Sequence, residues 1–183
     1  MVSRIRVPNT FGPLDDAVDH AWDGLRSDPV ANRVFYAASE AANFSMIWHV
    51  LGIAKAVATG DVRSAIRTSA ALGAESAIVN GPIKSIFERE RPDVDASERP
   101  HRLRQPRTSS FPSGHASAAV VAASFLGEGL SRRWRLPLHG LAAIVSTSRI
   151  HVRIHHATDV AAGAAVGWGL ARLLRPVLRS VID

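Results

Sequence analysis

Cysteine is absent from this sequence of 183 residues, which excludes disulfide bonds, thiolate zinc sites and a cysteine nucleophile. Lysine is nearly absent as well, because Lys55 and Lys84 are the only two. Almost all of the 22 basic residues are therefore arginine, and the net charge is +6. Arginine-rich chains suit phosphate, anionic lipid or nucleic acid as partners, although a solvated basic surface has the same composition.

Long hydrophobic runs are scarce too, and the mean hydropathy is near neutral, which is low for a protein that crosses a membrane several times. The runs without charged residues lie at 41–54, 108–127, 136–148 and 160–171. Only the second run reaches the ~20 residues that a bilayer core requires, so these are marginal membrane spans. No secretory signal is expected, because Arg4 and Arg6 are followed by proline, glycine and aspartate instead of an apolar stretch.

Strand signals are missing, since the sequence has no sustained alternation of apolar and polar residues. Helical spacing covers most of the chain, so the expected fold class is all-α. A helix over 14–25 is amphipathic, with Val18 and Trp22 on its apolar face. Its aspartates, Asp15 and Asp16 among them, form a solvated face and make it too charged to span a membrane. Further helices are expected over 31–59, 62 to 80, 116–126, 137 to 150 and 158–174.

The last polar cluster, SRIHVRIHHATD over residues 148–159, has the spacing of a positioned nucleophile. His155 and Asp159 share one face of a helix. Asp159 can accept the Nδ1 proton of His155, which leaves the Nε2 lone pair free to attack. The planar guanidinium of Arg149 can bind two phosphate oxygens. In isolation, a surface His–Asp pair on a basic helix end has the same pattern.

An earlier cluster, KSIFERERP, carries further cations. Lys84 and Arg91 are separated by nearly two helical turns, so both can point to one side of a helix that Pro92 ends. Arg89 and the glutamates beside it are interpreted as the solvated face of this helix end. The connection that follows, residues 93–107, is the longest loop, and loops of this kind often carry specificity.

The central cluster, PSGH, lies where a helix is expected to begin. Free backbone N–H groups and the helix dipole favour an anion there, and Gly114 permits close approach of the backbone. When protonated, His115 can donate to a leaving oxygen as a general acid. The clusters together supply cations, amide donors, an oriented nucleophile and an acid, which are the parts of a metal-free phosphoryl-transfer site.

The motifs K-x6-RP, PSGH and SR-x5-H-x3-D, in this order, resemble the type 2 phosphatidic acid phosphatase (PAP2) superfamily, which shares its site with vanadium haloperoxidases. The resemblance implies a PAP2-type bundle of about six helices. It also implies a phosphohistidine intermediate at His155, oriented by Asp159, with His115 as the acid. The residues that it assigns to phosphate binding are Lys84, Arg91, Ser113, Gly114 and Arg149. It implies neither a cofactor nor a metal.

The resemblance favours a bacterial-type integral membrane enzyme with about four or five spans. Residues 1–30 are expected to form a tail and amphipathic helix, and residues 31–183 the PAP2-type helical domain. The helix order places the three clusters on one side, while the other side is basic with few acids. The positive-inside rule then locates the protein in the cell (inner) membrane as a multi-pass protein, with its active site on the non-cytosolic side.

The expected function is hydrolysis of the phosphate or diphosphate of a lipid. Candidate substrates are polyprenyl phosphate or diphosphate, phosphatidic acid, phosphatidylglycerophosphate and lipid-linked sugar phosphates. A vanadate-dependent haloperoxidase and a soluble acid phosphatase are alternatives with the same site, and a protein that only binds anionic lipid or nucleic acid is a non-enzyme alternative. We expect a membrane but no nucleic acid as partner, and the sequence carries no signal for the oligomeric state. His151 and His155 have a spacing that suits zinc, but no third ligand is evident.

Overall fold

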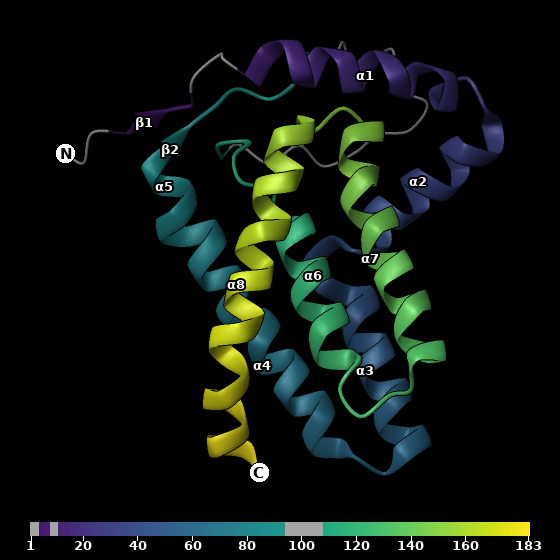
Figure 1. Cartoon of the computed structure of the whole chain (residues 1–183), viewed down its shortest axis with the longest axis vertical. Coiled ribbons are helices and arrows are strands. Elements are labelled where there is room, and N and C mark those ends of the chain that lie inside the picture. Colours follow the sequence, from purple (N-terminus) through teal and green to yellow (C-terminus); the bar gives the residue numbers. More distant parts are fainter. Residues whose placement is uncertain (1–3, 8–10, 94–107) are drawn as a thin grey trace.

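Long helices run along the molecule, and one further helix lies across their end (Figure 1). The computed structural model describes residues 4–7, 11–93 and 108–183, so most of the predicted 93–107 loop lies outside the described residues. The elements in chain order are β1 (Ile5–Arg6), α1 (Gly12–Arg26), α2 (Pro29–Ala41), the 3-10 turn η2 (Asn43–Ser45), α3 (Met46–Thr59), α4 (Val62–Ile78), the π-turn η3 (Val79–Ile83), α5 (Lys84–Ile86), β2 (Phe87–Glu88), α6 (Gly114–Leu126), α7 (Arg132–His151) and α8 (Ala157–Ile182). The expectation of an almost wholly helical chain is confirmed.

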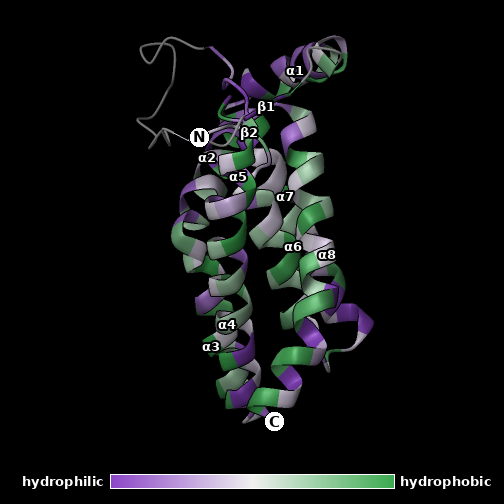
Figure 2. Cartoon of the chain, turned by 90° about the vertical axis from the view of Figure 1, so that its left-hand side faces the viewer, coloured by the Kyte–Doolittle hydropathy of each residue, from purple (hydrophilic) through white to green (hydrophobic). Residues whose placement is uncertain are grey.

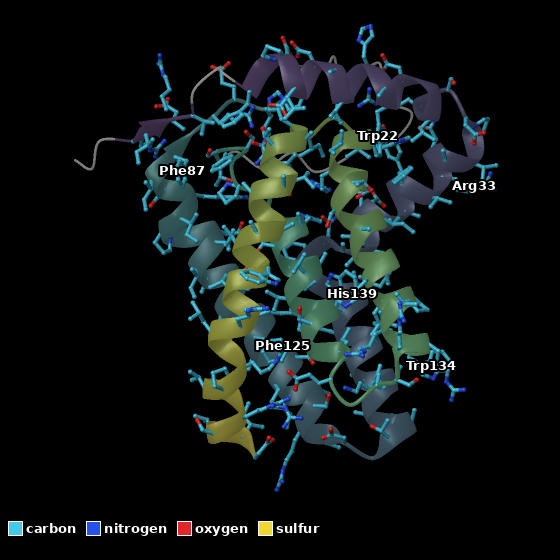
Figure 3. The ribbon with its side chains drawn as sticks, viewed as in Figure 1. Trp22, Arg33, Phe87, Phe125, Trp134 and His139 are labelled. Carbon is cyan, nitrogen blue, oxygen red and sulfur yellow. The ribbon has the colours of Figure 1, made fainter. Side chains whose placement is uncertain are left out.

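Helix α6 forms the centre of the bundle, because most of its residues are small or apolar. It contacts α3, α4, α7 and α8, and most of its side chains are buried. Phe125, near its end, points into the interior (Figure 3) and is only 2% exposed. Burial of such a side chain contributes about 1.5–3 kcal/mol. The direction of α6 follows from this packing, and its N-terminus, which carries the PSGH motif, lies at the end of the bundle under α1.

Two glycines allow α8 to lie directly on the backbone of α6. A Cβ atom added at Gly163 would lie 2.3 Å from the carbonyl oxygen of Ser113, and one added at Gly167 would lie 2.4 Å from that of Ser117. No side chain fits at either distance. The small-residue spacing in α8 therefore sets the approach of two helices that both carry motif residues at their N-termini.

Gly163→Ala should lower the melting temperature by several degrees, because the added methyl group forces α8 away from α6 and overpacking of this kind costs about 1–3 kcal/mol. Gly169→Ala is the matched control in the same helix, since nothing lies within 4 Å of a Cβ at that position. The control should be neutral or slightly more stable, because alanine favours a helix interior. The measurement is thermal unfolding of the purified protein in detergent. Equal melting temperatures for the two variants would contradict the close contact of α8 with α6 at Gly163.

The helix expected over 31–59 is broken in the structure. Helix α2 ends at Ala41, and α3 begins at Met46 after the turn η2. Phe44 and Ser45 have φ angles of 54° and 59°, in the left-handed region that non-glycine residues rarely adopt. Nothing in the residue types of this stretch predicts the break. It brings Asn43 against the PSGH motif, a tertiary contact that local propensity does not encode.

The ends of α7 and α8 also differ from the prediction. Helix α7 begins at Arg132, so one turn precedes Pro137, where the sequence had indicated the start. A proline removes a single intrahelical hydrogen bond, and near a helix start this loss is tolerated. Helix α8 continues past Leu174 to Ile182, because Arg175 and Arg179 pair with Glu128 at 2.6 and 3.1 Å and hold the charged last turns in place.

Helix α1 lies across the end of the bundle, where Val18 and Trp22 pack beside Ile150 and Val160 as its apolar face predicts. The predicted solvated face is wrong at Asp15, which is only 4% exposed. It is buried because it finds hydrogen-bond partners at the start of α8. The short strands β1 and β2, which the sequence did not predict, pair in parallel nearby.

None of the described helices is by itself both long and apolar enough to cross a membrane. Helix α2 together with the following segment Asn43–Thr59 does meet both conditions, and this pair is bent by 68°. Helix α6 is apolar but shorter.

Candidate active site

The three predicted clusters meet in one pocket of about 330 Å³ at the end of the bundle beneath α1. They meet there because α6 and α8 begin at this end, α7 finishes at it, and α4 leads up to it through η3 and α5. The predicted site residues that line the pocket are Lys84, Gly114, His115, Arg149 and His155. Ser113 and Asp159 are buried behind this lining, and Arg91 contacts the His155 ring.

His155 lies on the short connection between α7 and α8, so the prediction that it shares a helix with Asp159 is wrong. Its backbone N–H and that of Ile154 both donate to the carbonyl oxygen of Arg149, at 3.1 Å each, so the connection is folded tightly. The ring is 3% exposed. Burial lowers the pKa of His155 to about 3, although Asp159 acts in the opposite direction. The imidazole is therefore neutral at physiological pH, and one ring nitrogen carries a lone pair.

The two ring nitrogens of His155 face opposite charges. Nδ1 lies 3.5 Å from Oδ2 of Asp159, slightly long for a hydrogen bond. Nε2 lies 3.3 Å from Nη1 of Arg91. A guanidinium directed at Nε2 can bind an anion next to this ring nitrogen.

Asp159 is completely buried in the first turn of α8. Its Oδ2 atom accepts a hydrogen bond of 2.9 Å from the backbone N–H of His156, and its Oδ1 atom accepts one from Arg89. Its backbone carbonyl accepts a hydrogen bond from the Ser113 N–H at 2.9 Å. The same residue therefore faces the His155 ring and ties the PSGH turn to α8.

The PSGH turn starts α6 with Ser113 as the N-cap residue. The first N–H groups of a helix have no intrahelical partner, so this end suits an anion. A Cβ at Gly114 would approach the side-chain oxygen of Asn80 to 3.0 Å, so glycine keeps this approach open. Nε2 of His115 lies 3.2 Å from the side-chain oxygen of Asn43.

Three cations surround the pocket. Lys84, on the short helix α5, is 7% exposed, and its pKa is lowered to about 8, first by burial and then by Arg91 and Arg149. Arg149 lies in the last turn of α7, with its guanidinium against the Ser39 hydroxyl. Arg91 also donates to the carbonyl oxygen of Ile154 at 2.9 Å, which fixes it beside the His155 ring. This arrangement can neutralise a phosphate dianion.

The comparison with protein families agrees with this geometry. Residues 65–181, well over half of the chain, match the model of the PAP2 superfamily. The chain belongs to the PAP2 superfamily. The resemblance found in the three motifs is confirmed.

The PAP2 fold is also seen in solved structures. A transmembrane PAP2-type phosphatidylglycerolphosphate phosphatase from Bacillus subtilis superimposes with a TM-score of 0.70 at 24% sequence identity, over 95% of this chain and 89% of that chain. LpxE from Aquifex aeolicus superimposes with a TM-score of 0.66 at 20% identity, over 90% of this chain and 93% of that chain. These likenesses show that the chain has the fold of the PAP2 proteins.

A curated relative of this PAP2 chain is a decaprenylphosphoryl-5-phosphoribose phosphatase from Mycobacterium tuberculosis. The two sequences are 37% identical over 86 residues, which are 46% of this chain and 45% of the relative. The chain thus spans about half the length of the curated relative it matches.

Four residues near the PAP2 motifs were missed by sequence reasoning, or were given a weaker role than their position warrants. Arg89 was interpreted as solvent-facing, yet it pairs with Asp159 and Asp15, both buried. Asn43 contacts His115. Glu75, inside the helix predicted over 62 to 80, is 1% exposed and lines the pocket. Asp15 and Glu75 lie in predicted helices, but no spacing rule indicates that their side chains point into the protein at this end of the bundle.

His151, whose spacing from His155 suits zinc, is held by contacts with α2. Its Nε2 atom hydrogen-bonds to the side-chain oxygen of Asn32 at 2.8 Å, and its ring stacks on Phe35 with centroids 4.5 Å apart. No group of three or more potential His, Asp or Glu ligands occurs among residues 4–7, 11–93 and 108–183. The i, i+4 pair with His155 is therefore explained by packing of α2 against α7.

Proposed function

We propose that this protein is a membrane-bound phosphatase that removes phosphate from a lipid through a phosphohistidine intermediate at His155. The observation that carries the proposal is the neutral, buried imidazole of His155, with Arg91 at 3.3 Å from Nε2 and a carboxylate behind Nδ1. Lys84 and Arg149 line the same pocket and supply the remaining positive charge. A nucleophile, an orienting carboxylate and three cations are what phosphoryl transfer requires.

In the first step, Nε2 of His155 attacks phosphorus and forms a P–N bond while the P–O bond to the lipid breaks. His115 gives its proton to the leaving oxygen. The bound phosphate favours the protonated form of His115, because an adjacent negative charge stabilises a cation. Asp159 balances the positive charge that develops on the His155 ring. Lys84, Arg91 and Arg149, with the first N–H groups of α6, stabilise the transferring oxygens.

In the second step, water attacks the phosphohistidine. His115, now neutral, accepts a proton from this water, and the P–N bond breaks to return the neutral His155 ring. Inorganic phosphate leaves with the proton that His115 accepted, and the next substrate binds as its monoanion and returns a proton to His115. His115 is therefore a partner in every proton transfer of the scheme.

A membrane location is supported by apolar side chains on the outer surface of the helices. Ile53 and Val57 of α3, Leu173 of α8 and Trp134 of α7 are all more than half exposed. Apolar segments occur along the length of the long helices (Figure 2), and Trp134 lies near the end remote from α1 (Figure 3). In a membrane, lipid would cover these apolar side chains, which would otherwise be exposed to water.

The site is proposed to face the non-cytosolic side. The opposite end of the bundle carries basic residues at the end of α3, at the starts of α4 and α7 and along the last turns of α8. Because the natural chain has no cysteine, Ser131→Cys in the exposed turn before α7 gives one labelling site. An impermeant maleimide should label it only after the membrane is opened, and labelling of intact cells would reverse the orientation.

A lipid-linked sugar phosphate is the substrate that we favour. The pocket lining beyond the phosphate site includes the polar side chains Ser45, Asn80 and Thr108, which can hydrogen-bond a hydroxylated headgroup. The mycobacterial relative is named for a phosphoribose carried on a polyprenyl phosphate. Phosphatidic acid, phosphatidylglycerophosphate and polyprenyl phosphates or diphosphates are the competing substrates.

The test is phosphate release by the purified protein in detergent, with each of these lipids and with EDTA present. We expect release from at least one lipid phosphate, undiminished by EDTA and fastest for the lipid-linked sugar phosphate. Loss of activity with EDTA would contradict the metal-free mechanism. Release from none of the lipids would contradict the proposed substrate class.

The dependence of kcat/KM on pH should show an alkaline limb near the pKa of Lys84, about 8. The ammonium group is the form that binds phosphate, so activity is present below this pKa and is lost as pH rises through it. Lys84→Arg should move the limb upward by more than about one pH unit, because arginine stays charged. Lys55→Arg replaces the only other lysine and should leave the limb in place. If the alkaline limb of kcat/KM stays at the same pH in Lys84→Arg, a group other than Lys84 causes it.

A further inference from the structure

A guanidinium lies between two buried carboxylates on the outer side of the catalytic pair. Arg89 contacts Oδ1 of Asp159 through Nη1 and Oδ2 of Asp15 through Nη2, at 2.5 Å each. The side chains are 12%, 0% and 3% exposed, respectively. Neither carboxylate could stay charged at such a position without a cation between them. Arg89 is thus the counter-ion of the residue that faces the His155 ring.

The start of α8 is held by the same group. The Thr158 N–H donates to Oδ1 of Asp15 and the Thr158 hydroxyl donates to Oδ2, both at 2.9 Å. The hydroxyl oxygen also accepts from Nη1 of Arg89 at 2.8 Å. Asp15, which belongs to α1, therefore acts as an N-terminal cap for α8 from outside that helix.

Helix α1 is anchored at its other end to α7. Arg26 donates to the carbonyl oxygens of Ile150 at 3.0 Å and His151 at 3.1 Å, where α7 ends. An acid on the start of α8 and a base on the end of α7 both complement the helix dipoles. Helix α1 therefore bridges the 152–156 connection that carries His155, and fixes both of its ends.

We propose that Asp15 and Arg89 are positioning residues for the reaction: Asp15 on α1 orients Arg89, Arg89 holds the Asp159 carboxylate, and Asp159 sets the tautomer of the His155 ring. The proposal rests on the proposed function of His155 as the nucleophile. Neither residue touches the pocket that holds the phosphate. Their effect on catalysis therefore passes through Asp159.

The contacts of Asp159 explain why such support is needed. Oδ2 faces His155 Nδ1 at 3.5 Å while it accepts from the His156 N–H at 2.9 Å, so a small rotation of the carboxylate decides whether the ring is held. Arg89 fixes the other oxygen, Oδ1, and so opposes that rotation. Without Arg89, the His155 ring could carry its proton on Nε2, and the lone pair would point away from phosphorus.

The kinetic test uses Asp15→Asn, Arg89→Lys and Arg89→Ala in the full chain. We expect Arg89→Ala to lower kcat by roughly 10–100-fold with KM nearly unchanged, as for removal of other supporting partners of catalytic groups. Arg89→Lys should retain more activity than Arg89→Ala, because lysine keeps the positive charge although it lacks the planar guanidinium that binds two carboxylates at once. Asp16→Asn is the matched control, since Asp16 is the exposed neighbour of Asp15 and has the same charge. It should behave as the wild type.

Removal of Arg89 leaves Asp15 and Asp159 facing each other, and this variant can fail to fold. The double variant Asp15→Asn/Arg89→Gln removes that repulsion, so the positioning role can be tested even if Arg89→Ala does not fold. A pocket of about 460 Å³, lined in part by Asp15 and Arg89, lies beside the pair. Guanidinium ion at concentrations well below those that denature should enter it and restore part of the activity of Arg89→Ala, an effect that a merely structural loss would not show.

A measurement that needs no substrate completes the test. In protein labelled with ¹⁵N at the histidine rings, His155 should be a single Nδ1–H tautomer in the wild type and a mixture in Asp15→Asn/Arg89→Gln. An unchanged tautomer, or an equal loss of kcat in Asp16→Asn, would overturn the positioning role. If the wild type releases phosphate from no lipid, the proposed function fails, while the ring spectrum still decides whether Asp15 and Arg89 set the tautomer.

Discussion

His155→Ala should abolish the release of phosphate from a lipid substrate, with a loss of at least ~10⁴-fold in kcat. The variant lacks the atom that forms the P–N bond, and water cannot take its place efficiently within a site arranged around an imidazole. A loss of this size corresponds to about 5.5 kcal/mol of transition-state stabilisation. His139→Ala is the matched control, because His139 is exposed on α7 away from α1 (Figure 3). This control should keep wild-type activity.

The proposed phosphohistidine intermediate gives a second readout of the same residue. Substrate labelled with ³²P at the scissile phosphate should transfer label to the wild-type protein, with the acid lability and alkali stability of a phosphohistidine. No label should appear on His155→Ala. Label that persists on this variant would assign the nucleophile elsewhere, and full turnover without any label would point to direct attack by water.

Most of the candidate site could be predicted because its residues are held by short-range geometry. The helices predicted to hold His155 with Asp159 and Lys84 with Arg91 are wrong, because His155 precedes α8 and α5 ends at Ile86, well before Arg91. Each pair still converges on the site, because few residues separate its members. The role of Gly163 in helix packing also follows from residue size, since only a missing side chain allows the approach to Ser113. A short separation in sequence limits the distance between two residues whatever conformation the backbone adopts, so both pairs stay close without the expected helix.

The supporting residues could not be predicted because their partners are distant in sequence. Arg89 and Asp15 are 74 positions apart, and they meet only because α1 lies across the bundle end. Periodicity assigned Asp15 to a solvated face, and burial of an acid depends on a cation that another element delivers. The break between α2 and α3 has the same origin, since the contact of Asn43 with His115 spans 72 positions. Tertiary contacts overrode local preference at each of these places.

His115→Gln should lose activity in a manner that depends on the leaving group. With a lipid phosphate, whose leaving alkoxide needs a proton, we expect kcat to fall by ~10²–10⁴-fold. With p-nitrophenyl phosphate, whose phenolate leaves without protonation, the same variant should lose much less. The comparison is internally controlled, because the nucleophile, the three cations and the start of α6 are unchanged between the two assays.

The contact of His115 with Asn43 sharpens this prediction. Nε2 of His115 lies 3.2 Å from the Asn43 side-chain oxygen, so this oxygen occupies the position that a leaving oxygen would take. Asn43→Ala removes this partner but leaves the acid in place, and its loss should be small and equal for the two substrates. A loss in His115→Gln that is also equal for both would show that His115 binds phosphate without protonating the leaving group. If His115→Gln loses activity only with the lipid phosphate, His115 acts as the acid. His155→Ala should lose activity with both the lipid phosphate and p-nitrophenyl phosphate, so the two roles can be distinguished.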